Sequence, residues 1–83
     1  MMDAKARAIK DINKLSVMII RFRTLGLADK YPRVLEYIEN YAADARHFYE
    51  KEDYFSAFGA ANYAYGFIDA VLVIEGRKDE HIL

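Results

Sequence analysis

The sequence predicts an all-α fold, an antiparallel up-down-up bundle of three helices at roughly residues 3–25, 32–51 and 53–75. In these three stretches apolar residues recur at steps of three and four, which is typical of amphipathic helices. No run alternates with a period of two, so no strand is expected. One proline and four glycines in 83 residues argue against a loop-rich or disordered chain. This length supports one domain, predicted at residues 1–76, followed by a polar C-terminal tail at residues 77–83.

The first predicted helix covers residues 3–25. Asp3 is its N-cap or a first-turn acid, because a carboxylate there accepts free backbone N–H groups. Gly26 is suited to end the helix in a left-handed conformation. The expected buried stripe follows steps of four and three: Ala8, Ile12, Leu15, Ile19 and Phe22.

The second predicted helix covers residues 32–51. Pro32 suits a first turn, where its missing N–H is not needed, and either Asp29 or Tyr31 lies near the cap. The same stepping predicts a buried stripe of Val34, Ile38, Tyr41, Ala45 and Phe48. The short loops on either side of this segment force neighbouring helices to run antiparallel.

The third predicted helix begins at Asp53, its expected N-cap, and ends before Gly76. Its inward stripe is Tyr54, Ala57, Ala61, Ala64, Ile68 and Val71, broadened by Ala60, Gly66, Leu72 and Ile74. Gly66 costs about 1 kcal/mol of helix stability relative to alanine. Either close packing or a bound group is expected to offset that cost.

A candidate binding face lies on the third helix, beside its apolar stripe. Its residues are Asn62, Tyr63, Tyr65, Gly66 and Asp69. Bare backbone at Gly66, between a carboxamide and a carboxylate, predicts a shallow polar notch. The alternative is a set of interhelical hydrogen bonds that fixes the register, which is favoured because buried polar groups in small bundles are usually structural.

Asp44 and His47 form a secondary candidate site, three residues apart on the second helix. A metal site needs three or four convergent ligands, so no metal is expected, and the pair is better read as a histidine near a carboxylate. Neither serine lies in a nucleophile elbow, and there is no glycine loop that would cradle a phosphate. No catalytic residue and no cofactor are therefore predicted, and an enzyme acting through Asp69 with Asp44 or His47 is the least favoured interpretation.

Charge is distributed unevenly. Residues 1–25 hold six basic and two acidic side chains, a net of +4, whereas the remainder has six basic and eleven acidic ones, a net of -5. A basic first helix can bind phosphates, so a nucleic-acid or nucleotide-binding module is the alternative function. A solvated or complementing face is favoured, because no aromatic residue is interleaved with these cations along the helix.

Seven tyrosines are more than so narrow a core can bury. Surface tyrosines are enriched in protein interfaces, because each offers a large apolar face at modest entropic cost. The expected function is therefore a non-enzymatic protein-interaction or self-association module, with a protein partner or a homo-oligomer. A cytoplasmic location without a membrane is expected, because the apolar run Val17–Ile20 is too short to span a bilayer.

The stretch from Asp44 to Ala70 has an Asp-Ala pair, an aromatic residue, an Asp-Tyr turn and the run Tyr-Ala-Tyr-Gly-Phe-Ile-Asp-Ala. It resembles the mainly archaeal family called domain of unknown function 357. Two positions depart from the family pattern: Glu52 replaces a turn glycine, and Phe67 replaces a tryptophan. The resemblance implies a three-helix bundle, and the family has no assigned function. The matching residues are Asp44, Ala45, Phe48, Asp53, Tyr54, Ala57, Tyr63, Ala64, Gly66 and Asp69.

Overall fold

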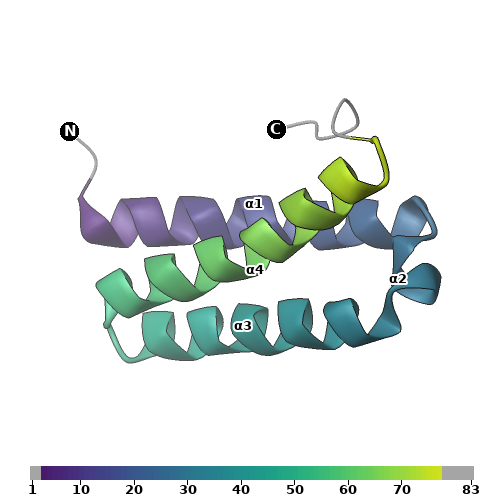
Figure 1. Ribbon diagram of the computed structural model, residues 1–83. Helices are drawn as coiled ribbons and strands as arrows, with labels where there is room; N and C mark the ends of the chain where they lie inside the picture. Colours follow the sequence, from purple (N-terminus) through teal and green to yellow (C-terminus); the bar gives the residue numbers. More distant parts are fainter. Residues whose placement is uncertain (1–2, 78–83) are drawn as a thin grey trace.

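The computed structural model describes residues 3–77, and this part of the chain is all-helical, as predicted (Figure 1). Its four helices are α1 (Ala4–Thr24), α2 (Leu27–Lys30), α3 (Pro32–Glu50) and α4 (Tyr54–Ile74). Figure 1 shows the three long helices side by side, with the chain reversing direction from α1 to α3 and again from α3 to α4. The predicted count of three helices was wrong, because it omitted α2.

The short helix α2 lies in the predicted break between the first two long helices. Gly26 precedes it in the left-handed conformation, with φ of 77°, and Leu27 is buried. A single turn has no apolar period, so the sequence pattern could not reveal it. Tyr31 takes the N-cap position of α3 and Pro32 opens that helix, whereas Asp29 lies within α2.

Both predicted N-caps are confirmed. The Asp3 carboxylate accepts a hydrogen bond from the Ala6 backbone N–H at 2.8 Å, and the Asp53 carboxylate accepts one from Ser56 at 3.2 Å. Each bond satisfies a first-turn donor that has no partner within its helix.

Glu52 turns the chain between α3 and α4 in a conformation that favours glycine. Its φ is 62°, the left-handed region that costs a residue with a Cβ about 1–2 kcal/mol. The turn is closed by N–H groups of Glu52 and Asp53, which donate to the carbonyls of Tyr49 at 3.0 Å and Phe48 at 2.9 Å. The departure from the family's turn glycine is therefore a site of backbone strain.

The end of α4 is tied back to the bundle. Gly76 has a φ of 68°, and the N–H of Arg77 donates to the Leu72 carbonyl at 2.8 Å. The Arg77 guanidinium reaches the Leu25 carbonyl at 3.3 Å. Arg77, the first residue of the predicted tail, thus packs on the bundle, and residues 78–83 of that tail lie outside the described residues.

Helix α4 is central, because it packs against both α1 and α3. Among residues 3–77 the buried side chains are all apolar. Met18 is fully buried on α1, whereas the predicted Ile19 is half-buried and packs against the core. The core is Ala8, Ile12, Leu15, Met18, Phe22, Leu27, Ile38, Ala42, Ala45, Ala57, Ala61, Ala64, Ile68, Val71 and Leu72.

Two residues expected to broaden the inward stripe of α4 face outward instead. Gly66 is exposed, and Ile74 is 72% exposed. The prediction was wrong here because α4 is apolar on both sides, so its periodicity does not separate an inner face from an outer one. This outward apolar surface is the starting point of the candidate site.

Within residues 3–77, only α4 is long and apolar enough to cross a membrane by length and composition. The mean hydropathy of its most apolar window is 1.4, and one third of that window is buried inside the fold. The core helix of a soluble protein meets the same criterion, so this finding alone is weak evidence for a bilayer.

Candidate functional site

The outer face of α4 exposes apolar and small residues along the whole helix. At about 100° per residue, its members fall within an arc of about 120°. Asp69 is the only charged residue of α4, and it borders this face rather than lying within it. The members are Phe55, Gly59, Asn62, Tyr63, Gly66, Ala70, Val73 and Ile74, all of them exposed.

Four aromatic side chains form a ridge along one edge of the outer face, between α3 and α4. Phe67 is at its centre, with ring centroids 5.7 Å from Tyr37, 6.0 Å from Tyr41 and 5.8 Å from Tyr63. Tyr41 and Tyr63 approach to 4.6 Å. Tyr41 and Phe67 are half-buried, whereas Tyr37 is 51% and Tyr63 is 60% exposed. The ridge therefore presents two tyrosine rings to solvent on a packed aromatic base.

A shallow hollow of about 380 Å³ lies beside this aromatic ridge. It is lined by Asn62, Tyr63, Gly66, Phe67 and Ala70. A Cβ added at Gly66 would meet nothing within 4 Å, so close packing within the chain does not explain this glycine. Of the five predicted site residues, the hollow brings together Asn62, Tyr63 and Gly66.

Asn62 joins the rim of the hollow to α1. Its side-chain amide donates to the Asp11 carboxylate and to the Phe58 carbonyl, both at 2.9 Å. Asn62 thus makes an interhelical hydrogen bond, as the structural interpretation expected, but its partner is a carboxylate of α1 rather than a tyrosine hydroxyl or a cation, and the position is exposed to solvent.

The two remaining predicted residues, Tyr65 and Asp69, lie on the α1 side of α4 rather than in the hollow. The Lys14 ammonium sits 4.7 Å from the centroid of the Tyr65 ring. Burial, followed by the nearby carboxylates of Asp69 and Asp11, raises the pKa of Tyr65. Both predicted residues are half-buried, and Tyr65 contacts α1 through Lys14.

Asp44 and His47, the secondary candidates, are exposed on α3. The His47 ring lies 6.2 Å from that of its neighbour Phe48. Among residues 3–77, no group of three or more His, Cys, Asp or Glu side chains gathers around this pair or elsewhere. The geometry does not join them to the outer face of α4.

A basic groove separates α1 from α4 on the other side of Asn62. It is lined by Arg7, Lys10, Asp11, Lys14, Phe58 and Asn62. The expected absence of aromatic residues concerned the first helix alone, and the rings that accompany the cations come from α4. Lys5 lies 5.9 Å from the Tyr54 ring and Arg7 lies 5.1 Å from the Phe58 ring. The two residues of each cation–aromatic pair are about 50 positions apart in the sequence, so the spacing of residues along one helix does not reveal these contacts.

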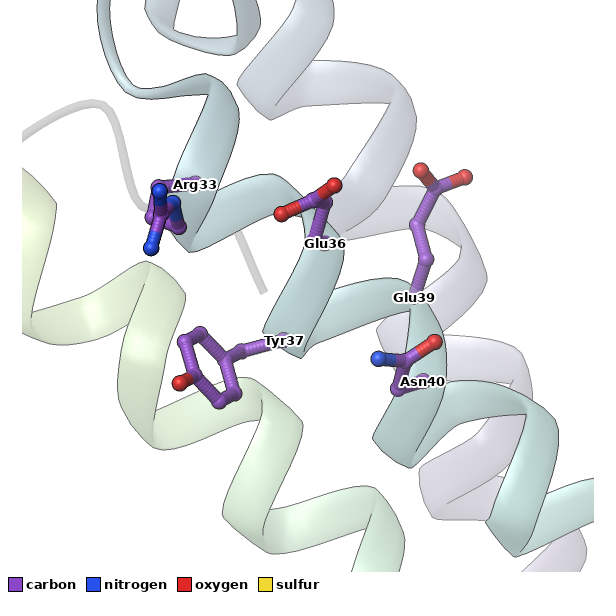
Figure 2. A pocket seen from close by; sticks show the side chains of 5 residues that line it. All are labelled: Arg33, Glu36, Tyr37, Glu39 and Asn40. Carbon is purple, nitrogen blue, oxygen red and sulfur yellow. The ribbon is translucent and has the colours of Figure 1, made fainter.

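A third concave area lies on the exposed surface of α3, beyond Tyr37 (Figure 2). Figure 2 shows that its five side chains all come from α3, with Tyr37 turned toward α4. Glu39 on its rim pairs with Arg23 of α1 at 2.8 Å. Because all its lining residues come from one helix, this area is open to solvent. It forms a charged border beside the aromatic ridge. Its members are Arg33, Glu36, Tyr37, Glu39 and Asn40.

A polar contact joins the end of α2 to the C-terminal end of α4. The Tyr31 hydroxyl donates to the Glu75 carboxylate, and the Lys30 ammonium lies 2.9 Å from the same oxygen. These two hydrogen bonds, that of Tyr31 first, lower the pKa of Glu75. The contact holds α2 against the end of α4, away from the hollow.

Sequence reasoning missed several members of the outer face, namely Phe55, Gly59, Ala70 and Val73. The signal that points to them is the near absence of charge along the 21 residues of α4. A helix that is apolar all round is normally covered on every side.

The fold and this surface define a small all-helical protein with an exposed apolar helix face, and residues 3–77 hold no group of three or more His, Cys, Asp or Glu side chains that could hold a metal ion. A model of the family described as protein of unknown function (DUF357) matches residues 6–76, so the chain belongs to that family. The resemblance identified from the sequence is confirmed. No curated protein and no solved structure matches the chain.

Proposed function

We propose that this chain is a non-enzymatic protein-interaction module, a bundle of three long antiparallel helices joined in part by α2. Its binding surface is the outer face of α4 together with the aromatic ridge. One observation carries the proposal: α4 buries one side in the core and still exposes apolar residues along its other side.

The size and continuity of this surface support a binding role. Single exposed apolar residues are ordinary, but contiguous ones mark interaction sites. Phe55 is 84% exposed, and Tyr63 and Val73 are both 60% exposed on the same side of α4. Covering them removes apolar area from water, at about 25 cal/mol for each Å².

Some of the predicted site residues contact the partner, and others stabilise the helix that presents them. Tyr63 is a wall of the hollow and Gly66 its open floor, so both contact the partner. Asn62 is held by Asp11 and offers a fixed polar group at the rim. Tyr65 contacts α1 and acts through the packing of the bundle.

The experiment is capture of partners from a nuclease-treated lysate of the source organism, using tagged protein and mass spectrometry. Tyr63→Glu places a charge on the outer face and is expected to lose the partner. Ile20→Glu is the matched control, because Ile20 is 65% exposed on α1, outside the proposed surface. Equal capture by both variants and the wild type contradicts the proposal.

A second candidate function, nucleic-acid or nucleotide binding, is favoured by the basic groove. Arg7, Lys10 and Lys14 line it beside the Phe58 ring, and cations with stacking surfaces suit phosphates and bases. Fluorescence anisotropy with single-stranded RNA tests this function at two salt concentrations. Binding that weakens with salt and is abolished by Lys10→Glu/Lys14→Glu supports it, and no binding in low salt excludes it.

A further inference from the structure

We infer that a second copy of this chain covers the outer face of α4, with the two α4 helices packed antiparallel about a two-fold axis between residues 64 and 65. This inference rests on the proposed function, because it names the partner of the same surface. Four features of that surface support the inference: the spacing of its residues along α4, its shape, its lack of charge and its exposed area.

Six of the eight members of the outer face have a spacing that reads the same in both directions, whereas Asn62 and Val73 fall outside this pattern. A two-fold interface needs this property, because each contact between two positions recurs with the copies exchanged. Positions 55, 59, 63, 66, 70 and 74 are separated by steps of four, four, three, four and four. Reversal about the midpoint pairs Phe55 with the partner's Ile74, Gly59 with the partner's Ala70, and Tyr63 with the partner's Gly66.

The shape of the outer face is complementary at these paired positions. Tyr63 projects from it at 60% exposure, and the adjacent hollow opens at Gly66, where a Cβ would meet nothing within 4 Å. In the antiparallel pair each Tyr63 ring enters the hollow of the other copy. At Gly59 and Ala70 small residues face each other, so the two backbones approach closely.

Charge favours pairing through this face over the others. None of its eight members is charged, so two copies meet here without repulsion. Charged residues lie on the exposed sides of α1 and α3, among them Lys10, Arg33 and Glu36, and burying such a face against a second copy removes water from these charges. A partner recognised through its own charge would need a residue of opposite charge on the outer face of α4, and none of the eight members is charged.

The available area suits a dimer. The exposed parts of Phe55, Tyr63 and Tyr37 together present about 400 Å² of aromatic surface. A standard interface buries about 800 Å² on each partner. Val73, Ile74 and the bare backbone along about 31 Å of helix supply the remainder.

Cysteine crosslinking tests the register, and the chain has no native cysteine to interfere. Phe55→Cys and Ile74→Cys are prepared separately and treated with a short bismaleimide, alone and mixed. In the antiparallel pair two copies of position 55 are about 28 Å apart, so only the mixture crosslinks efficiently. Equal crosslinking of either variant alone contradicts the antiparallel register, and no crosslinking in any sample contradicts the dimer.

Gly66→Leu separates association from folding. Its Cβ meets nothing within 4 Å inside one copy and the position is exposed, so we expect the fold to persist while the dimer dissociation constant rises by about tenfold or more. Asn13→Leu adds the same side chain at an exposed position of α1 and leaves the dissociation constant unchanged. An unchanged constant for Gly66→Leu overturns the inference.

Two further outcomes separate this inference from the proposed function. If the wild type is a monomer but a different protein binds in a manner that Tyr63→Glu abolishes, the dimer is wrong and the interaction module stands. If the wild type floats with phosphatidylcholine–phosphatidylglycerol vesicles and Tyr63→Glu does not, the outer face binds a bilayer, and both proposals are wrong.

Discussion

Gly66 lies in the middle of α4, so Gly66→Ala isolates the cost of a glycine in a helix. A new Cβ meets nothing within 4 Å there, and no steric penalty offsets the gain in helix propensity. The free energy of unfolding is therefore expected to rise by about 1 kcal/mol. In a domain of this size that raises the melting temperature by about 4–8 °C.

The assay is thermal and urea denaturation followed by circular dichroism, at a protein concentration low enough to keep the chain monomeric. Gly26→Ala is the matched control, since its Cβ also meets open space but its φ is 77°. Gly26→Ala is expected to lower the free energy of unfolding by about 1 kcal/mol, because alanine is strained in the left-handed region. Destabilisation by Gly66→Ala would refute the reasoning, since it requires a contact at Gly66 inside one copy.

Three other predictions concern the bundle itself. Glu52→Gly is expected to raise the free energy of unfolding by about 1 kcal/mol in urea denaturation, because the φ of 62° no longer strains the backbone; a lower stability contradicts this. Phe22→Ala, in the core, is expected to cost about 3–5 kcal/mol and to unfold much of the protein at 37 °C; a native melting curve excludes a tight core there. The lowered pKa of Glu75 means that its contact with Tyr31 stabilises the fold above its ordinary pKa of 4.5, and that this contribution is lost as the pH falls through the lowered value. Glu75→Gln should therefore be less stable than the wild type at pH 7, with a difference that shrinks in acid, and a difference independent of pH argues against the contact.

Much of the fold could be predicted because its determinants are local. The caps at Asp3 and Asp53 each involve a donor three residues away, and the apolar steps of α1 and α3 reflect one buried side per helix. Helix α2 was missed because four residues have no period.

The candidate site was predicted only in part, because its geometry depends on contacts between distant residues. Asn62, Tyr63 and Gly66 do share a hollow. Phe67 also lines it, and the Phe67 ring packs against Tyr37 and Tyr41 of α3, which are distant in sequence. On α4 both sides are apolar, so spacing alone assigned two outward residues, Gly66 and Ile74, to the core. The cations of α1 meet aromatic rings of α4, which no local pattern indicates.

Sedimentation equilibrium of the wild-type protein, from low micromolar to near-millimolar concentration, tests the central claim most directly. The account predicts that the mass rises from 9.6 kDa toward twice that value, and that Tyr63→Glu stays at the monomer mass while Ile20→Glu behaves as the wild type. A wild-type mass of 9.6 kDa at every concentration would contradict self-association through α4.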